Sequence, residues 1–306
     1  MQENNGRRNP FLLAPSIVLV LLAFFGVLSF IPLGNGFVPY IIAIVSELII
    51  FGGAIAASVY LRGTGWTKRC LAHGPKGSFL LCISAAGMMM VQSVGIRSFV
   101  IENFYDYRIF ELYGMRFESA TDSFGSFLWV FAALAVIPAV LEGVFFRGFL
   151  MHEYRYGGVF LSILVSSFLY AMTGMSIANF PIHFINGVLL SSVVFLTGSV
   201  VYSVLAHVAY ALFALSVEKY IFFIAEETRT LIFLVLVAVG LLSAIGFCGS
   251  AERLLRQRGE DEERAPIRLK KGRFLVVLKD MLTAPMLWAD VGCFVLVCLL
   301  HILLDA

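Results

Sequence analysis

The chain has 306 residues, of which 60% are hydrophobic, and its formal net charge is only +2. Soluble domains are roughly 45–50% apolar, so this composition excludes a soluble protein and predicts an all-α, polytopic transmembrane helical bundle. So small a net charge implies no nucleic-acid partner. The apolar composition makes membrane lipid the expected partner.

Apolar segments long enough to cross a bilayer recur along the chain. A spanning helix needs about 20 mostly apolar residues, and about eight or nine segments meet or approach that length. The first follows Arg7 and Arg8 without a small-residue cleavage site, which favours an uncleaved helix over a signal peptide. Pro138 is expected to bend the fourth. The expected spans are 11–33, 37–61, 78–100, 124–150, 159–178, 180–197, 199–218, 222–248 and 286–304.

Lysine and arginine residues predict the orientation. When the N-terminus is placed in the cytoplasm, Arg7, Arg8 and the many basic residues between 253 and 279 lie on the cytoplasmic side. This is the asymmetry that the positive-inside rule describes. We therefore expect a multi-pass protein of the plasma membrane with a cytoplasmic N-terminus, although the residues are also compatible with a eukaryotic endomembrane.

The sequence divides into three parts. Residues 1–123 hold the N-terminal transmembrane helices and an outer loop, residues 124–218 hold the core helices, and residues 219–306 hold the C-terminal helices with a charged cytoplasmic linker at 250–272. The outer loop, 101–123, is polar and aromatic, so it is either an interfacial lid or a plain connector. Phe274 to Leu282 reads as a short amphipathic helix at the membrane surface.

Glu142 is the leading candidate for a functional residue. A charge inside a membrane segment is costly and is a functional-site hypothesis by default. We place Glu142 in the cytoplasmic half of the fourth span, about two turns before its end, where partial desolvation favours a general base. A structural buried Glu is the alternative. Arg147 lies five residues later, so it is not expected on the same face of an α-helix, and snorkelling to the interface is an equal alternative for it.

Two histidines on apolar helices are weaker candidates. His207 lies in the middle of the seventh span, where a hydrogen-bonded core histidine is more common than a metal ligand. His183 and Asn186 are three residues apart and therefore share one helix face, which makes them candidates for a polar lining.

The motifs around these residues resemble those of a known family. Glu142-Gly-Val-Phe-Phe-Arg147-Gly-Phe-Leu150 resembles the first motif, Glu-Glu-x-x-x-Arg, of the CPBP (Abi) family of CAAX prenyl proteases and bacteriocin-processing proteins. Thr197 to His207 resembles the family's Thr-Gly-Ser start and the His ten residues after the Thr, and Ser166 to Met172 resembles the lead-in to its middle motif. The resemblance covers roughly residues 124–216 and implies a CPBP-type core with a polar pocket open toward the cytoplasm.

The sequence departs from the family pattern at three motif positions. Gly143 replaces the second Glu, Gly174 replaces the His of the middle Phe-x-x-x-His motif, and Ala211 replaces the Asn of the last His-x-x-x-Asn motif. In active members, the family mechanism has the first Glu and the middle His activate a water, while the last His and the Asn stabilise the oxyanion. An oxyanion donor is worth about a hundredfold or more in rate.

The resemblance thus implies that Glu142, Arg147 and His207 are the catalytic residues that remain. The metal ligands are unknown. Their candidates are Glu142, His207 and His183, and His183 is the nearest substitute for the missing histidine.

Three functions remain open at this stage. The narrowly preferred one is a degenerate protease of the CPBP type, a scaffold or regulator that binds a membrane-protein partner and has no cofactor. The second is an active intramembrane endopeptidase that takes a peptide substrate, with Glu142 as base, His207 as oxyanion stabiliser and zinc or another divalent metal. The third, ranked last, is a transporter or lipid-handling protein whose intramembrane charges line a pathway.

Overall fold

The structure, a computed structural model, describes residues 10–31, 37–67, 75, 77–100, 109–118, 124–218, 220–221, 226–260 and 271–305. Several sequence features lie outside these residues. They are Arg7, Arg8, residues 261–270 of the expected linker, and most of the expected outer loop.

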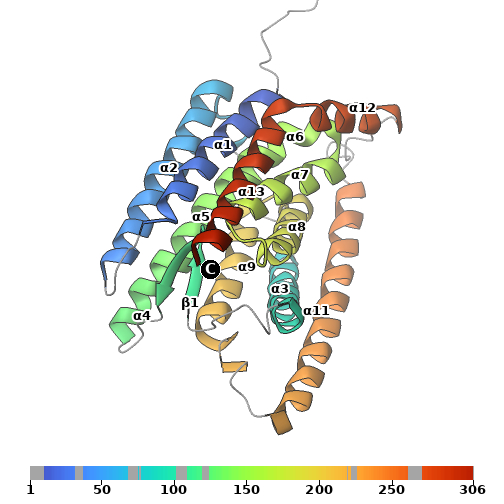
Figure 1. Cartoon of the computed structure of the whole chain (residues 1–306). Coiled ribbons are helices and arrows are strands. Elements are labelled where there is room, and N and C mark those ends of the chain that lie inside the picture. The colour runs from blue at the N-terminus through green and yellow to red at the C-terminus, as the bar shows by residue number, and fades with distance from the viewer. Residues whose placement is uncertain are drawn as a thin grey trace, which may run out of the picture.

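The described residues form a bundle of apolar helices (Figure 1). Seven stretches of helix are long and apolar enough to cross a membrane. Two shorter apolar helices, α1 (Pro10–Leu28) and α7 (Val159–Thr173), occupy the places of the first and fifth expected spans. The other helices outside the fourth span are α2 (Val38–Arg62), α3 (Ser78–Val100), α8 (Phe180–Thr197), α9 (Val200–Phe213) with the π-helix η5 (Ala214–Glu218), α11 (Glu226–Glu260), α12 (Lys271–Leu282) and α13 (Pro285–Asp305). The prediction of an all-α polytopic bundle is therefore confirmed.

The fourth span combines α-helical and π-helical segments. It is built from α4 (Phe124–Phe131), η2 (Ala132–Val136), α5 (Ile137–Glu142), η3 (Gly143–Leu150) and α6 (Met151–Tyr154), and it continues four residues past the expected end at 150. The π-helix η2 ends two residues before Pro138, whose missing N–H removes one α-helical hydrogen bond. The second π-helix, η3, begins immediately after Glu142.

A β-hairpin from the expected outer loop lies inside the bundle. Strands β1 (Ile109–Leu112) and β2 (Met115–Glu118) pair antiparallel. The turn residues Tyr113 and Gly114 both have positive φ, 52° and 77°, as the favoured two-residue hairpin turns require. Tyr113, Met115 and Phe117 are each at most 2% exposed. The loop is therefore neither a surface lid nor a plain connector at these residues, and Figure 1 shows the hairpin beside the C-terminal end of α13.

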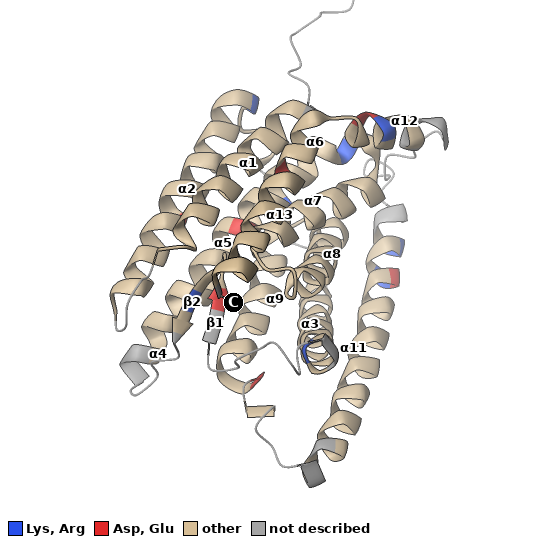
Figure 2. Cartoon of the chain, in the orientation of Figure 1, with Lys and Arg blue, Asp and Glu red and all other residues tan. Residues whose placement is uncertain are grey.

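The C-terminal helices pack around this core. Helix α11 packs mainly on α3 through small residues, since a Cβ at Gly246 would lie 2.6 Å from Ser84 Oγ. It continues to Glu260, so residues 250–260 of the expected linker are helical. Helix α12 covers the amphipathic segment expected from Phe274 to Leu282. Figure 2 shows that the described helices are mostly uncharged along their length, so the few charges inside the bundle stand out.

Candidate functional site

Glu142 lies deep inside the bundle. It is 3% exposed and sits near the middle of the span Phe127–Tyr154. The expectation that it lies two turns from the end of its helix is wrong, because the helix continues past residue 150. Glu142 is thus farther from the C-terminal end of its span than the sequence indicated.

The hairpin turn supplies a partner for this carboxylate. The hydroxyl of Tyr113 donates a hydrogen bond of 2.8 Å to Oε1 of Glu142. The Tyr113 ring stacks on Phe25, with ring centroids 4.1 Å apart, and these contacts hold a bulky residue at a φ that such residues rarely adopt. Burial, and then the nearby Glu142 carboxylate, raise the pKa of Tyr113 well above its ordinary value. The phenol therefore keeps its proton and remains a donor.

His207 lies on the other side of the carboxylate. Its Nδ1 is 3.7 Å from Oε2 of Glu142, which is too long for a hydrogen bond. Neither atom has a hydrogen-bond partner among the described residues. The structure therefore brings Glu142 and His207 together, as the sequence predicted, but leaves the two facing atoms unsatisfied.

Arg147 is buried, so the snorkelling alternative is wrong. It is 2% exposed, and its Cζ lies 4.1 Å from the centre of the Tyr170 ring. A guanidinium over an aromatic face is a favourable cation–π contact. Its two terminal nitrogens find no hydrogen-bond partner in the described part of the chain, although the charge interacts electrostatically with Glu142.

The π-helix explains why Arg147 faces this site. Hydrogen bonds in a π-helix run from residue i to i+5, so residues five apart lie closer to one face than they do in an α-helix. The α-helical spacing rule had separated Glu142 from Arg147. The hydroxyl of Ser166 on α7 donates 2.7 Å to the carbonyl oxygen of Phe146 and so anchors η3 to the neighbouring helix. Single π-helical turns are frequent at functional sites.

His183 fills the space beside Gly174. A Cβ at position 174 would lie 2.7 Å from Cδ2 and 3.0 Å from Nε2 of His183. The His183 ring also makes an edge contact with Tyr170, with ring centroids 5.9 Å apart, and Tyr170 makes a similar contact of 6.2 Å with His207. An imidazole from α8 therefore occupies the place that a side chain at 174 would need.

Close helix packing accounts for Gly143. A Cβ there would lie 2.7 Å from Cγ2 of Val204 on α9, so a side chain at 143 does not fit unless Val204 shifts. Ala211, at the Asn position of the last motif, is buried at 6% exposure.

Glu47 on α2 is a site residue that the sequence reasoning missed. It is fully buried, it interacts electrostatically with Glu142 and Tyr113, and neither of its carboxylate oxygens has a hydrogen-bond partner among the described residues. The available signal was a charge within the apolar span 37–61, the same signal that singled out Glu142.

The residues present do not fit a catalytic zinc site. Such a site needs three protein ligands and one open position. Within the described ranges, no group of three or more His, Cys, Asp or Glu side chains could hold a metal ion. Glu142 and His207 are close enough to act together, whereas His183 reaches the same region through its contact with Tyr170.

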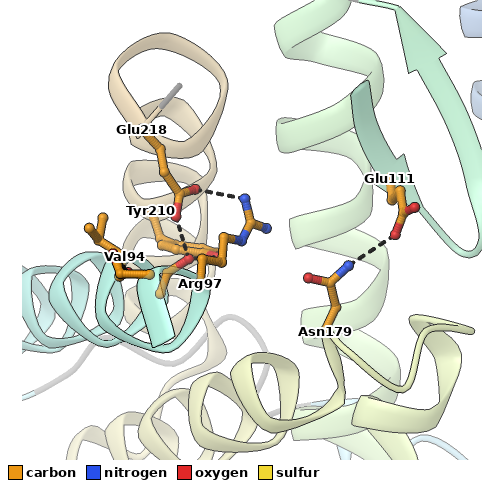
Figure 3. A network of polar contacts seen from close by, with 8 residues as sticks. Val94, Arg97, Glu111, Asn179, Tyr210 and Glu218 are labelled. Atoms are coloured by element: carbon orange, nitrogen blue, oxygen red, sulfur yellow. Dashed lines mark hydrogen bonds and ion pairs between the residues drawn. The ribbon is translucent and has the colours of Figure 1, made fainter. Parts of the chain in front are cut away.

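A second polar network joins α3, α8 and α9. Arg97 forms an ion pair of 3.1 Å with Glu218, and Ser93 donates to the same carboxylate at 2.7 Å. Figure 3 shows Arg97, Glu218 and Tyr210 converging there, with the Glu111–Asn179 hydrogen bond apart from them. Asn186 accepts 2.7 Å from Gln92. The expected shared lining of His183 and Asn186 is therefore split, since His183 faces Tyr170 and Asn186 faces Gln92.

Together these features define a polytopic helical membrane protein with a buried carboxylate, guanidinium and imidazole cluster at its core. Residues 124–213 match the family model of the type II CAAX prenyl endopeptidase Rce1-like proteins. This match confirms the resemblance to the CPBP family, and the matched segment contains Glu142, Arg147, His183 and His207. No curated protein and no solved structure matches the chain significantly.

Proposed function

We propose that this protein is a degenerate member of the CPBP type that binds a membrane-protein partner as a scaffold or regulator. One observation carries the proposal. The carboxylate that would act as the base is engaged by Tyr113 of the chain's own hairpin, 2.8 Å from Glu142 Oε1.

The chemistry around Glu142 supports a binding role. A general base needs a reachable water and a partner that tunes it, but the carboxylate is 3% exposed, and its contact with His207 is not a hydrogen bond. Gly174 and Ala211 provide no side-chain donor for an oxyanion. What remains is a polar core inside a membrane bundle, which is suited to recognising a polar group of another membrane segment.

Binding at this core requires the hairpin turn to move. The turn is tightly packed, because a Cβ at Gly114 would lie 3.0 Å from the Cβ atoms of both Ser29 and Met175. A two-stranded hairpin is marginally stable by itself, and Tyr113 keeps an unfavourable φ. A partner segment that satisfied Glu142 would therefore compete with Tyr113 for the same oxygen.

The test is a measurement of peptidase activity and metal content on purified protein in detergent, with wild type beside Glu142→Ala and His207→Ala. We expect no cleavage of a membrane peptide and no stoichiometric metal in any of the three proteins. We also expect photocrosslinking from a probe at position 113, in native membranes, to capture one discrete membrane protein. Stoichiometric metal and cleavage that both mutants lose would contradict the proposal.

An active intramembrane endopeptidase is the second candidate, and His183 favours it. The His183 imidazole lies where the side chain of the family's middle histidine would begin, so it could pair with Glu142 to activate water, with His207 at the oxyanion. In that case His183→Ala would abolish cleavage as fully as Glu142→Ala does. The transporter or lipid-handling hypothesis stays a prediction.

A further inference from the structure

Two carboxylates in the core have oxygens without a donor in the part of the chain that the structure describes. Both oxygens of Glu47 and Oε2 of Glu142 have no hydrogen-bond partner among the described residues, and both side chains are at most 3% exposed. A buried acceptor left without a donor costs about 1–3 kcal/mol, and more when it is charged. Such groups in a folded protein are satisfied by a protein group, an ordered water or a ligand, so these oxygens are candidate acceptors for a donor from a partner.

The surroundings of Glu47 favour a cationic group. Phe51 lies one turn after Glu47 on the same face of α2. The Phe51 and Tyr113 rings have centroids 5.8 Å apart, and Phe25 stacks on Tyr113. Aromatic faces attract cations, so carboxylates and rings here offer the same kind of recognition to one ligand.

The charges in the core are not balanced. Glu47 and Glu142 are two acidic side chains, and the one cation named beside them, Arg147, lies over the Tyr170 ring and acts on Glu142 through its charge without forming an ion pair within 4.0 Å. The other titratable side chains around the pair are Tyr113, Tyr170, His183 and His207. A like charge nearby disfavours an ionised carboxylate in apolar surroundings, and a cation bound between two carboxylates would favour both charges.

We propose that the membrane partner carries an arginine or lysine within its transmembrane segment, and that this side chain binds between Glu47 and Glu142 when Tyr113 withdraws. This inference rests on the proposed function and specifies the chemistry of the partner. Under this proposal, Glu47 determines specificity. Position 143, where the family has a second Glu, is Gly here, and Glu47 of α2 supplies the second carboxylate instead.

The depth of the site within the bundle favours a basic side chain of a spanning helix over a lipid headgroup or a metal ion. Glu142 lies near the middle of its span. The middle of a typical hydrocarbon core is about 15 Å from the headgroup layers, so a transmembrane residue is a better match for this depth than a lipid headgroup. A bound metal ion would need three ligands, which the described residues do not provide. A basic side chain on a spanning helix reaches this depth, and intramembrane basic residues are usually paired.

The experiment uses full-length protein in phosphatidylcholine vesicles and a synthetic transmembrane peptide of about 20 residues. One peptide carries a central arginine, which stays charged at every accessible pH, and its control carries glutamine at the same place. Energy transfer from the protein's tryptophans to a dansyl group on the peptide reports binding. We expect wild type to bind the arginine peptide at least about tenfold more tightly than the glutamine peptide.

Substitutions then assign the preference to Glu47. Glu47→Gln should abolish the preference for arginine, whereas Asp290→Asn, at a carboxyl on α13 that is equally buried and unpartnered among the described residues, should keep it. Tyr113→Phe frees Glu142 Oε1 without changing the charge. It should tighten binding of the arginine peptide and leave binding of the glutamine peptide unchanged. This variant tests the proposal if Glu47→Gln does not fold.

The outcomes separate the two proposals. Equal binding of both peptides to wild type would overturn the arginine inference and leave the binding function standing. A preference that persists in Glu47→Gln would also overturn it. If neither peptide binds, the inference falls, and the photocrosslinking experiment decides the binding function separately.

Discussion

The phenol oxygen of Tyr113 lies 2.8 Å from Oε1 of Glu142, so a residue between two spans donates to the carboxylate at the centre of the next span. The two residues are 29 positions apart in the sequence. Their contact links the hairpin to the residue on which every proposed activity of this protein depends, and it is the first contact to test.

Removal of the Tyr113 hydroxyl should destabilise the protein and make Glu142 more reactive. Tyr113→Phe keeps the ring on Phe25 but leaves a buried carboxylate without its donor, which costs about 1–3 kcal/mol. Thermal unfolding in detergent measures the loss, and labelling by a hydrophobic carbodiimide, which attacks protonated carboxyls, should increase at Glu142. Tyr60→Phe is the matched control because Tyr60 is 88% exposed. Unchanged labelling in Tyr113→Phe would show that the hydrogen bond does not govern the state of Glu142.

The contact between Gly174 and His183 predicts a compensating pair of substitutions. Gly174→His places a side chain where a Cβ already approaches the His183 ring to 2.7 Å, so it should destabilise by about 1–3 kcal/mol. His183→Gly in the same chain vacates that space and should restore most of the stability. A double-mutant cycle from thermal unfolding measures the coupling. Additive effects in that cycle would mean that the two positions do not share one space.

Gly143→Ala should be destabilising because of Val204. A Cβ at 143 would lie 2.7 Å from Val204 Cγ2, and overpacking of this kind costs about 1–3 kcal/mol. Val204→Ala should relieve that cost when the two changes are combined. Gly52→Ala is the control, since no atom lies within 4 Å of a Cβ at that position. The same melting temperature for Gly143→Ala and Gly52→Ala would contradict the close approach of α9.

Arg147→Lys should weaken the core even though it keeps the charge. The flat guanidinium lies over Tyr170, and an ammonium does not reproduce that stacking. We expect a loss of about 0.5–2 kcal/mol. Tyr170→Leu should remove the same contact, so Arg147→Lys should cost much less in a Tyr170→Leu background. Equal costs in both backgrounds would locate the role of Arg147 elsewhere.

The sequence predicted the bundle and the family resemblance because both depend on local signals. Long apolar runs decide which residues cross a bilayer, and the spacing of Glu142 and Arg147 lies within a single motif. The snorkelling alternative for Arg147 and its placement on a different helix face were wrong because they assumed α-helical spacing, and no feature of residues 143–150 identifies a π-helix in advance. The burial of Arg147 follows from that backbone geometry and from Tyr170, which is 23 residues away in the sequence.

The parts of the site that the sequence did not predict come from packing between distant segments. Tyr113 reaches Glu142 only because a hairpin enters the bundle. Glu47, like Glu142, is a charged residue inside an apolar span, but it belongs to no motif. The sequence of α2 therefore did not indicate that Glu47 lies near Glu142. The outer loop was ambiguous because aromatic residues suit a membrane interface as well as a protein interior.

The position of the His183 ring changes how a missing motif residue should be interpreted. Position 174 belongs to the family's middle motif, so Gly174 is seen as a missing histidine. Position 183 belongs to none of the motifs, so His183 is not noticed when motifs are compared. In the structure, the His183 ring lies where a side chain at position 174 would begin. A relative that has exchanged the two residues would therefore look intact by its motif and could present the same ring to Tyr170, so paired changes at 174 and 183 are a better marker of descent for this core than either position alone.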